Sequence, residues 1–158
     1  ANMLGAPATI IMPEDAPALA GVFRRSTEEL GPRDYSPAQV AAWASRVPDA
    51  SAFRSRLTDG RKVFVAELGK PVGFIDLEPD GHIDLLYVTP DVAGTGVAVA
   101  LYKTLEQAAR QTGLTRLYTE ASEAARRFFL KQGFTELHRR DFDLSGIKIH
   151  NYAMEKRL

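Results

Sequence analysis

Cysteine is absent from the 158 residues of this chain. That absence excludes disulfide bonds, thiolate metal sites and a cysteine nucleophile. An excess of either charge is also absent, because 20 Lys and Arg residues balance 20 Asp and Glu residues. A neutral balance gives no electrostatic argument for nucleic acid or an anionic membrane as a partner. We therefore expect neither partner, and we predict no metal site.

Long apolar runs are missing as well. No run approaches the roughly 20 residues of a membrane-spanning helix. The apolar stretch at residues 3–12 is too short, and too uncharged at its front, for a signal peptide. A cytoplasmic location is therefore the default expectation. The chain has no internal repeat, low-complexity tract or linker, and its length suits one domain over residues 1–158.

The most informative stretch is a strand, a glycine turn and a helix. Residues 83–88 form a short apolar run, typical of a buried strand, that ends near Pro90 because proline has no N–H for a strand ladder. Gly94 and Gly96 follow, and apolar residues then recur at helical spacing to about Thr112. A helix N-terminus attracts anions, and glycine lets the backbone approach a phosphate. This turn therefore indicates a pyrophosphate cradle, although an ordinary turn explains the same pattern.

Two other phosphate-binding motifs match this turn less well. A P-loop requires Lys and then Ser or Thr after its second glycine, and Val97 and Ala98 stand there instead. A dinucleotide fingerprint requires Gly or Ala three positions after Gly96, where the chain has Val99. Glu120 does follow the turn at a sequence separation that suits a ribose contact. A NAD-type dinucleotide-binding protein therefore stays as a weaker alternative.

The order of the predicted elements argues against a doubly wound sheet. The expected elements are a strand at 8–12, a helix capped by Asp15, helices from Ser36 and at 50–57, strands at 63–68, 71–77 and 83–88, a helix to Thr112, a strand at 114–121, a short helix after Ser122, and strands at 134–144 and 147–154. Three consecutive strands before the glycine turn break the alternation of strands and helices that a doubly wound sheet needs. A helix joins the strands at 83–88 and 114–121, so these two should be parallel.

The strand and glycine turn resemble motif A of the GNAT superfamily of acyl-CoA-dependent N-acyltransferases. Five residues match its pattern: Leu86, Val88, Pro90, Gly96 and Ala98. Ala93 is a departure, because the family has Arg or Gln at that position. The element order also matches the family over essentially the whole chain. The resemblance implies an α/β, layered α+β fold with a mixed, mostly antiparallel central sheet of six to seven strands. Helices would cover both faces, and the parallel strands at 83–88 and 115–121 would splay apart.

A second stretch, at 120–134, resembles motif B of the same superfamily. Three residues match it: Ala125, Gly133 and Phe134. Ser122 takes the position of an asparagine, where a polar side chain can bond the pantetheine arm. Phe129 takes the position of a tyrosine that often protonates the leaving thiolate. A phenyl ring cannot donate a proton, so that role has to pass to another residue or to water.

The resemblance implies an enzyme that moves the acetyl group of acetyl-CoA directly to an amine of a small molecule or peptide. The backbone of Leu86, Tyr87 and Val88 would hydrogen-bond the pantetheine arm as an added strand. The pyrophosphate would lie against the glycine turn, formed by Gly94, Thr95, Gly96, Val97, Ala98 and Val99. Ser122 and Phe129 would complete the cofactor contacts, although core packing is the favoured interpretation for at least one of Phe128 and Phe129. A non-catalytic acyl-CoA-binding sensor or interaction module on the same fold is the main alternative.

Direct transfer to an amine requires a base, because an alkylamine is mostly protonated at neutral pH. Asp84, in the apolar strand, is the first candidate, His82 is the second, and Glu120 on the neighbouring strand is the third. Tyr152 and Tyr87 are candidates for the acid. A structural or surface role is the alternative for each of these residues.

The acceptor amine is less well defined by the sequence. Tyr35 and Trp43 are predicted to line its pocket. An acidic stretch hints at a cationic acceptor such as a polyamine, although surface solubility explains most of it equally well. The residues of this stretch are Asp76, Glu78, Asp80 and Asp84. The sequence leaves a homodimer open.

Overall fold

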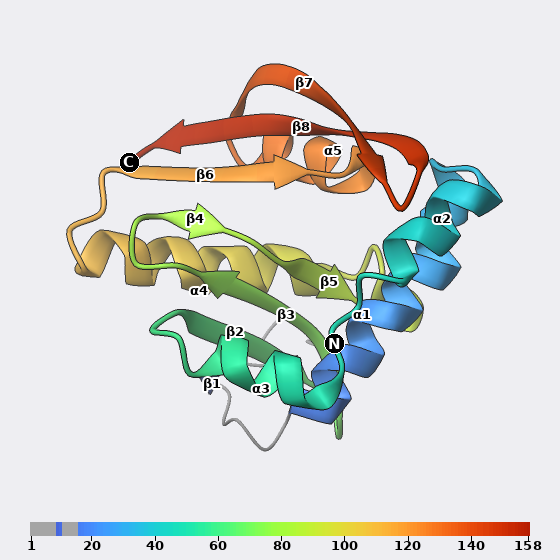
Figure 1. Ribbon diagram of the computed structural model, residues 1–158. Helices are drawn as coiled ribbons and strands as arrows, with labels where there is room; N and C mark the ends of the chain where they lie inside the picture. Colours follow the sequence, from blue (N-terminus) through green and yellow to red (C-terminus); the bar gives the residue numbers. More distant parts are fainter. Residues whose placement is uncertain (1–8, 11–15) are drawn as a thin grey trace.

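Two four-stranded sheets and their flanking helices make up the computed structural model, which describes residues 9–10 and 16–158 (Figure 1). The first sheet has the order β1-β2-β3-β5, and the second has the order β4-β6-β8-β7. The strands are β1 (Thr9–Ile10), β2 (Lys62–Glu67), β3 (Pro71–Leu77), β4 (His82–Ile83), β5 (Leu86–Val88), β6 (Arg116–Ala121), β7 (Thr135–Leu144) and β8 (Ile147–Arg157). The helices are α1 (Ala16–Leu30), α2 (Pro37–Ala44), α3 (Ala50–Leu57), α4 (Val97–Gln111) and α5 (Glu123–Lys131), with 3₁₀ turns at Gly31–Arg33 and Pro90–Val92.

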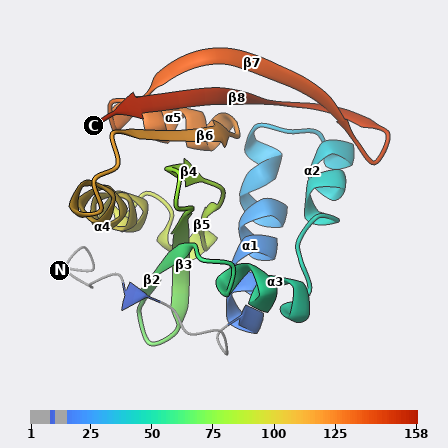
Figure 2. The same cartoon turned by 60° about the vertical axis from the view of Figure 1, so that its left-hand side comes forward.

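Helices cover both faces of the first sheet, as predicted. Leu101 of α4 packs on one face with Phe64 and Ile75, whereas α1 and α3 pack on the other with Val63 and Phe74. Figure 2 shows α4 on one side of β3, with α1 and α3 on the opposite side. Because both faces are buried, β2 and β3 are almost continuously apolar.

The second sheet combines a parallel pair with an antiparallel hairpin. β4 runs parallel to β6, with Ile83 opposite Thr119, which confirms the predicted parallel pairing. The β7–β8 hairpin turns at Ser145 and Gly146, whose φ angles of 52° and 79° suit a tight hairpin turn. α5 packs on one face of this sheet, where Phe129 lies in the same core as Met154 of β8 (Figure 1).

The helices begin where the local chemistry predicts. Ser36 caps α2, its hydroxyl accepting the N–H of Gln39 while the Gln39 side chain accepts the N–H of Ser36. Asp49 caps α3 by accepting the N–H of Ala52 at 2.8 Å, and Ser122 caps α5. The longest described helices, α1 and α4, have 15 residues each, and no helix of the described chain is long and apolar enough to cross a bilayer.

The mixed α/β fold with helices on both faces of a sheet is as predicted, but the strand count and the continuity of the central sheet differ from the prediction. The structure has two four-stranded sheets, because the strand predicted at 83–88 is divided into β4 and β5. Of the strand predicted at 8–12, only β1 lies within the described residues. The helix cap predicted at Asp15 lies outside them.

Candidate active site

The division between β4 and β5 is fixed by a buried carboxylate from the neighbouring strand. The backbone N–H groups of Asp84 and Leu85 both donate to Oδ1 of Asp76, at 2.9 and 2.8 Å. Oδ2 of Asp76 accepts a hydrogen bond from Arg61 at 2.6 Å. Asp76 is 1% exposed, and a charged group so deeply buried requires partners of this kind. This side chain therefore sets the point where β4 stays beside β6 and β5 turns to β3.

β5 is paired on one side only within the described residues, because it ends the first sheet. Tyr87 lies opposite Phe74 of β3, and the N–H of Thr89 donates to β3 at 2.8 Å. In an antiparallel pair, alternate residues direct their N–H and C=O groups away from that partner. The backbone groups of Leu86 and Val88 therefore face away from β3, where an extended ligand can pair with them.

The glycine turn has the backbone shape that an anion cradle needs. Gly94 and Gly96 have φ angles of 78° and 92°, in the left-handed region that favours glycine. The first backbone bond into α4 runs from the N–H of Ala100 to the C=O of Gly96 at 3.0 Å. The N–H groups of residues 97–99 precede that bond and have no partner within the helix. They can therefore hold a phosphate, with Thr95 fixed beside them by its hydroxyl bond to the C=O of Val92.

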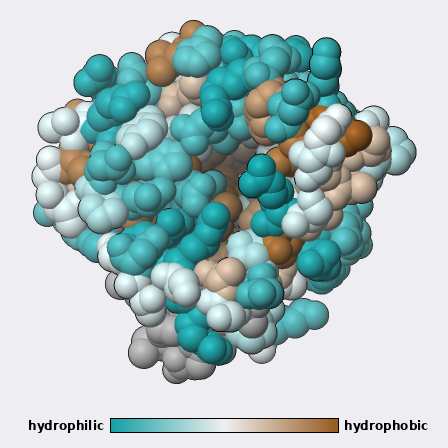
Figure 3. Space-filling view, in the orientation of Figure 1, coloured by the Kyte–Doolittle hydropathy of each residue, from teal (hydrophilic) through white to brown (hydrophobic). Residues whose placement is uncertain are grey.

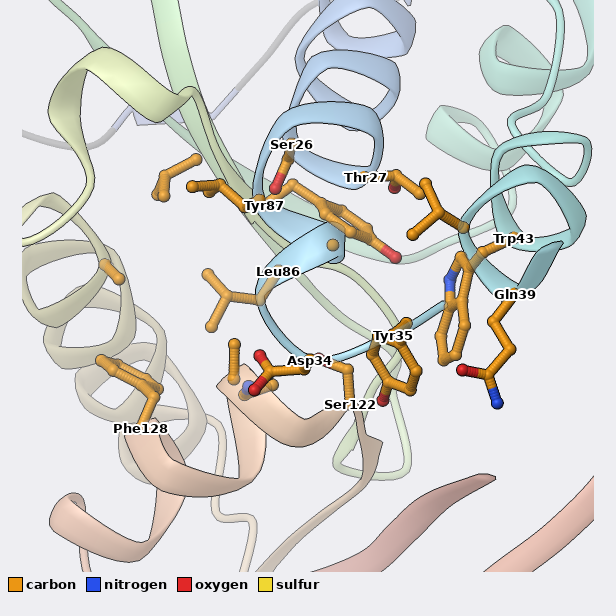
Figure 4. Close-up of a pocket in the computed structure, with 17 residues that line it drawn as sticks. Ser26, Thr27, Asp34, Tyr35, Gln39, Trp43, Leu86, Tyr87, Ser122 and Phe128 are labelled. Carbon is orange, nitrogen blue, oxygen red and sulfur yellow. The ribbon is translucent and has the colours of Figure 1, made fainter. Parts of the chain in front are cut away.

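A cavity of about 190 Å³ lies between β5, α1, α2 and α5 (Figure 4). Five predicted cofactor contacts line it: Leu86, Tyr87, Val88, Ala98 and Ser122. The predicted acceptor contacts Tyr35 and Trp43 line it too, so the structure brings both groups to one cavity. The other predicted residues of the glycine turn, at positions 94–97 and 99, do not line the cavity. α4 contributes Ala98 to the wall. Figure 3 shows a hollow near the middle of the surface, with apolar residues inside a hydrophilic rim.

The α1–α2 side of the wall contains residues that the sequence did not single out. They include Ser26, Thr27, Asp34, Gln39 and Val40. Asp34 is held by Arg127 of α5 through two hydrogen bonds, of 3.0 and 2.9 Å. The two residues are 93 positions apart, and no local pattern in the sequence points to their pairing.

Tyr35 connects the α1–α2 segment to the start of α5. Its hydroxyl accepts the N–H of Glu123 at 3.0 Å and donates to the C=O of His150 at 3.4 Å. Burial raises the pKa of the Tyr35 phenol to about 12, so it keeps its proton at neutral pH. The Glu123 carboxylate accepts hydrogen bonds from the His150 ring and, at 2.8 Å, from the Tyr152 hydroxyl. Tyr152 is thus held beside the α5 terminus but does not line the cavity.

Asp84, the first predicted base, is bound in an ion-pair cluster outside the cavity wall. Its Oδ2 lies 3.0 Å from Arg56 of α3 and 3.0 Å from Arg61. Arg61 also holds Asp76 and Asp59, so Asp84 belongs to the group of charges that fixes the strand division. This structural role explains an acidic residue in an otherwise apolar strand.

His82 and Glu120, the other predicted bases, contact each other across β4 and β6. Nε2 of His82 lies 2.8 Å from Glu120, and Nδ1 lies 2.6 Å from Glu78. The hydrogen bond to Glu120, followed by that to Glu78, raises the pKa of His82 to about 9 against the opposing effect of burial. His82 is therefore protonated at neutral pH, and neither residue lines the cavity.

The acidic stretch has partners within the chain. Asp76 binds Arg61, Glu78 binds His82, and Asp84 binds both Arg56 and Arg61. The hydroxyl of Tyr118 donates to Asp80. Ligand atoms of Glu78, His82 and Asp84 lie within 4.8 Å of one another, but a protonated imidazole and two neighbouring guanidinium groups disfavour a cation there. The hint of a cationic acceptor therefore loses its basis.

Phe129 lies in the core and not in the cavity wall, which corrects its predicted cofactor contact and confirms the core-packing alternative for one phenylalanine of the pair. It is 1% exposed and packs against Phe134 and Tyr102, with ring centroids 4.7 and 6.1 Å away. Phe128, the preceding residue, lines the cavity (Figure 4). Phe128 and Phe129 are adjacent in α5, yet one lines the cavity and the other lies in the core. The sequence alone does not show which of the two faces the cavity.

A comparison with protein families identifies the family of this chain. Residues 32–156 match the model of the acetyltransferase (GNAT) domain, so the chain belongs to the GNAT family. A relative in Escherichia coli (strain K12), the uncharacterized N-acetyltransferase YafP, is 32% identical over 143 residues, which cover 90% of this chain and 89% of YafP.

Solved structures show the same GNAT fold. A GCN5-related N-acetyltransferase from Rhodopseudomonas palustris is 38% identical, with a TM-score of 0.89 over 97% of this chain and 96% of that one. The PaiA N-acetyltransferase from Thermoplasma acidophilum, solved in complex with coenzyme A, is 19% identical, with a TM-score of 0.76 over 96% and 99%. Family membership and the antiparallel pairing of β2, β3 and β5 disfavour the NAD-type alternative.

Proposed function

We propose that this protein transfers the acetyl group of acetyl-CoA to the amine of a small molecule or peptide. The observation that carries the proposal is one cavity in which the β5 backbone meets an aromatic wall formed by Tyr35, just before α2, and Trp43 of α2. One side suits an extended acyl donor, and the other suits an acceptor. The N-acetyltransferase name of YafP and the coenzyme A bound to the PaiA protein support this assignment. A cytoplasmic location, and the lack of nucleic-acid and membrane partners, remain predictions.

The residues present fit acetyl-CoA. Leu86 and Val88 would pair with the amide groups of the pantetheine arm. The N–H groups of residues 97–99 would hold the pyrophosphate, and the left-handed glycines keep side chains away from it. Ala93 supplies no polar side chain, so the backbone provides these contacts. When bound, acetyl-CoA supplies an activated acetyl thioester.

The proton of the acceptor amine needs a base in the cavity. Among the described residues of the wall, Asp34 is the one carboxylate, whereas Asp84, His82 and Glu120 lie outside the wall. We assign proton acceptance to Asp34, whose two hydrogen bonds to Arg127 fix its orientation. Asp34 thereby replaces Asp84 as the first candidate base.

Thermal shifts with acetyl-CoA, CoA, NAD and ATP, followed by a screen of amines with thiol detection, test this function. A ligand at about 100 times its dissociation constant stabilises by about 2.7 kcal/mol. For a chain of this length, that corresponds to a rise of roughly 5 to 10 °C in melting temperature. We expect the melting temperature to rise with acetyl-CoA and with CoA but not with NAD or ATP. We also expect thiol release when a suitable amine is added. Absence of a rise with either CoA species would contradict the proposal, and binding without thiol release for any amine would favour the sensor alternative.

A further inference from the structure

Residues 31–44 form one wall of the cavity, yet they are weakly packed. This stretch, called the α2 segment below, comprises the 3₁₀ turn after α1 and α2 itself. Six of its residues line the cavity: Gly31, Asp34, Tyr35, Gln39, Val40 and Trp43. Ala42 and Ala44 are its two buried side chains, whereas α1 before it buries six. A segment with so few buried side chains opens at a lower free energy than the rest of the fold.

α2 depends on its neighbours for stability. It has eight residues, and isolated helices shorter than about 12–15 residues are marginal in water. It packs on the tip of the β7–β8 hairpin in a small cluster with three buried residues, which are Ala42, Leu144 and Ile149. Gln39 and Tyr35 add single hydrogen bonds to backbone C=O groups of β8, at 3.0 and 3.4 Å.

The outer side of the α2 segment is open to solvent. Four of its residues there are exposed: Ser36, Pro37, Ala38 and Ala41. The segment can therefore move outward without displacing another described element. Trp43 is its one link to the larger core of α1 and α3 among the described residues, and this side chain is partly buried.

Two polar contacts hold the α2 segment against α5. Arg127 of α5 donates to both oxygens of Asp34, at 3.0 and 2.9 Å, and the N–H of Glu123 donates to the Tyr35 hydroxyl at 3.0 Å. The Arg127 side chain is 53% exposed, and Glu123 begins α5, so its N–H has no partner within the helix. Water can replace the partner of each group, which makes both contacts easy to break and to form again.

We propose that the α2 segment is a lid over the aromatic side of the cavity, and that the contacts of Asp34 and Tyr35 with α5 hold it shut. Figure 4 shows Asp34 and Tyr35 near Ser122, the residue that precedes α5. Opening the lid exposes the aromatic side, while β5, α4 and α5 keep their places. Closing it restores the two hydrogen bonds that orient Asp34; the catalytic meaning of that step rests on the proposed function, whereas the lid itself does not.

Hydrogen exchange of the intact protein measures how often the lid opens. The amides of residues 40–45 are bonded within α2 and its end, so they exchange only when this helix opens. We expect them to exchange faster than the bonded amides of α4, whose buried residues include Leu101 and Leu105. Exchange in α2 as slow as in α4 would overturn the lid.

Arg127→Gln tests the contact with Asp34. An exposed ion pair shifts an equilibrium by up to about fivefold, so we expect exchange at residues 40–45 to accelerate by up to that factor. Arg126→Gln is the matched control, because Arg126 is the preceding residue of α5 and pairs instead with Glu136 of β7. It should keep the parental exchange rates. Equal rates in the two variants would overturn the role of Arg127.

Trp43 gives an independent measurement, because it is the one tryptophan of the chain and belongs to the lid. Acrylamide quenching of its fluorescence increases when the lid opens more often. We expect stronger quenching in Arg127→Gln than in Arg126→Gln. Tyr35→Phe, which removes the hydroxyl bound to Glu123, should also increase quenching. Parental quenching in both Arg127→Gln and Tyr35→Phe would overturn the proposal.

The lid and the acetyltransferase function fail in different ways. Faster exchange and stronger quenching in Arg127→Gln, in a protein that gives no thermal shift with CoA, would reject the function and keep the lid. A thermal shift with CoA, with slow exchange in α2 and no effect of Arg127→Gln, would reject the lid and keep the function.

Discussion

Oδ1 of Asp76 lies 2.8 Å from the backbone nitrogen of Leu85, on the segment that separates β4 from β5. The same oxygen accepts the N–H of Asp84. One carboxylate oxygen therefore accepts hydrogen bonds from the backbone of two consecutive residues at the point where the strand is interrupted. The divergence of the two sheets, and with it the position of the cavity, depends on this contact.

Asp76→Ala should therefore lower the free energy of unfolding strongly. The substitution leaves two buried N–H groups without their acceptor and leaves the Arg61 side chain, 8% exposed, without its closest counter-charge. Removing one partner of a buried ion pair costs about 3–5 kcal/mol. Urea denaturation monitored by circular dichroism measures the loss.

Asp59→Ala is the matched control for that experiment. Asp59 binds the same Arg61 side chain at 2.9 Å, but its own side chain is 42% exposed. An exposed ion pair contributes about 1 kcal/mol or less. Equal losses in the two variants would contradict the role given to Asp76.

Gly96→Ala should weaken CoA binding by at least about tenfold, equivalent to about 1.4 kcal/mol. A Cβ at a φ of 92° is strained, and it shifts the backbone N–H groups at the start of α4. Isothermal titration with CoA measures the effect.

Gly60→Ala imposes the same backbone strain at a φ of 98°, in the turn before β2 and with open space around it. We expect it to lower thermal stability as Gly96→Ala does, with CoA affinity unchanged. A similar CoA affinity in both variants would remove the glycine turn from the site.

Asp34→Asn should lower kcat by about 10²–10⁴-fold while CoA still binds, because the amide retains the shape of the side chain but cannot accept the amine proton. Steady-state kinetics with the best amine of the screen measures the change. Asp141→Asn, at an exposed ion pair with Arg139, is the control and should retain full activity. A larger loss in Asp84→Asn than in Asp34→Asn would return the role of base to Asp84.

His82 should make stability depend on pH above neutrality. Its folded pKa of about 9 lies above its ordinary value of 6.5, so its contribution is fully present below pH 6.5 and is lost as the pH rises through about 9. Glu78 and Glu120 are each about one-third exposed, so screening reduces the contribution to about 1–2 kcal/mol.

His82→Gln should remove this dependence, so that the variant loses less stability than the parent between pH 6.5 and 9. Urea denaturation at both pH values measures it. His138→Gln changes an exposed histidine of β7 and should keep the parental pH dependence. The same pH dependence in His82→Gln as in the parent would show that another group titrates.

Features that depend on neighbouring residues were predictable from the sequence. Ser36 and Pro37 predicted the start of α2, and α3 has the predicted bounds of 50–57. Gly96 predicted the turn before α4, because a left-handed backbone favours glycine. In each case the deciding interaction lies within a few positions.

Features that depend on distant pairs were not predictable from the sequence. The break at Asp84 and Leu85 depends on Asp76 and, behind it, on Arg61, so an apolar run that is typical of one strand became two. The pairing of Asp34 with Arg127 spans 93 positions, so the sequence did not single out Asp34 and favoured Asp84, which lies outside the cavity wall. Local periodicity carries no information about either pair.

The unpaired side of β5 also bears on aggregation. A strand edge left open to solvent can recruit a strand from another molecule. Here α1, α2 and α5 line the same cavity as Leu86 and Val88, so a full strand with side chains on both faces is too bulky to enter. A slender chain such as a pantetheine arm is not. We therefore expect this edge to accept the proposed cofactor more readily than a strand of another protein.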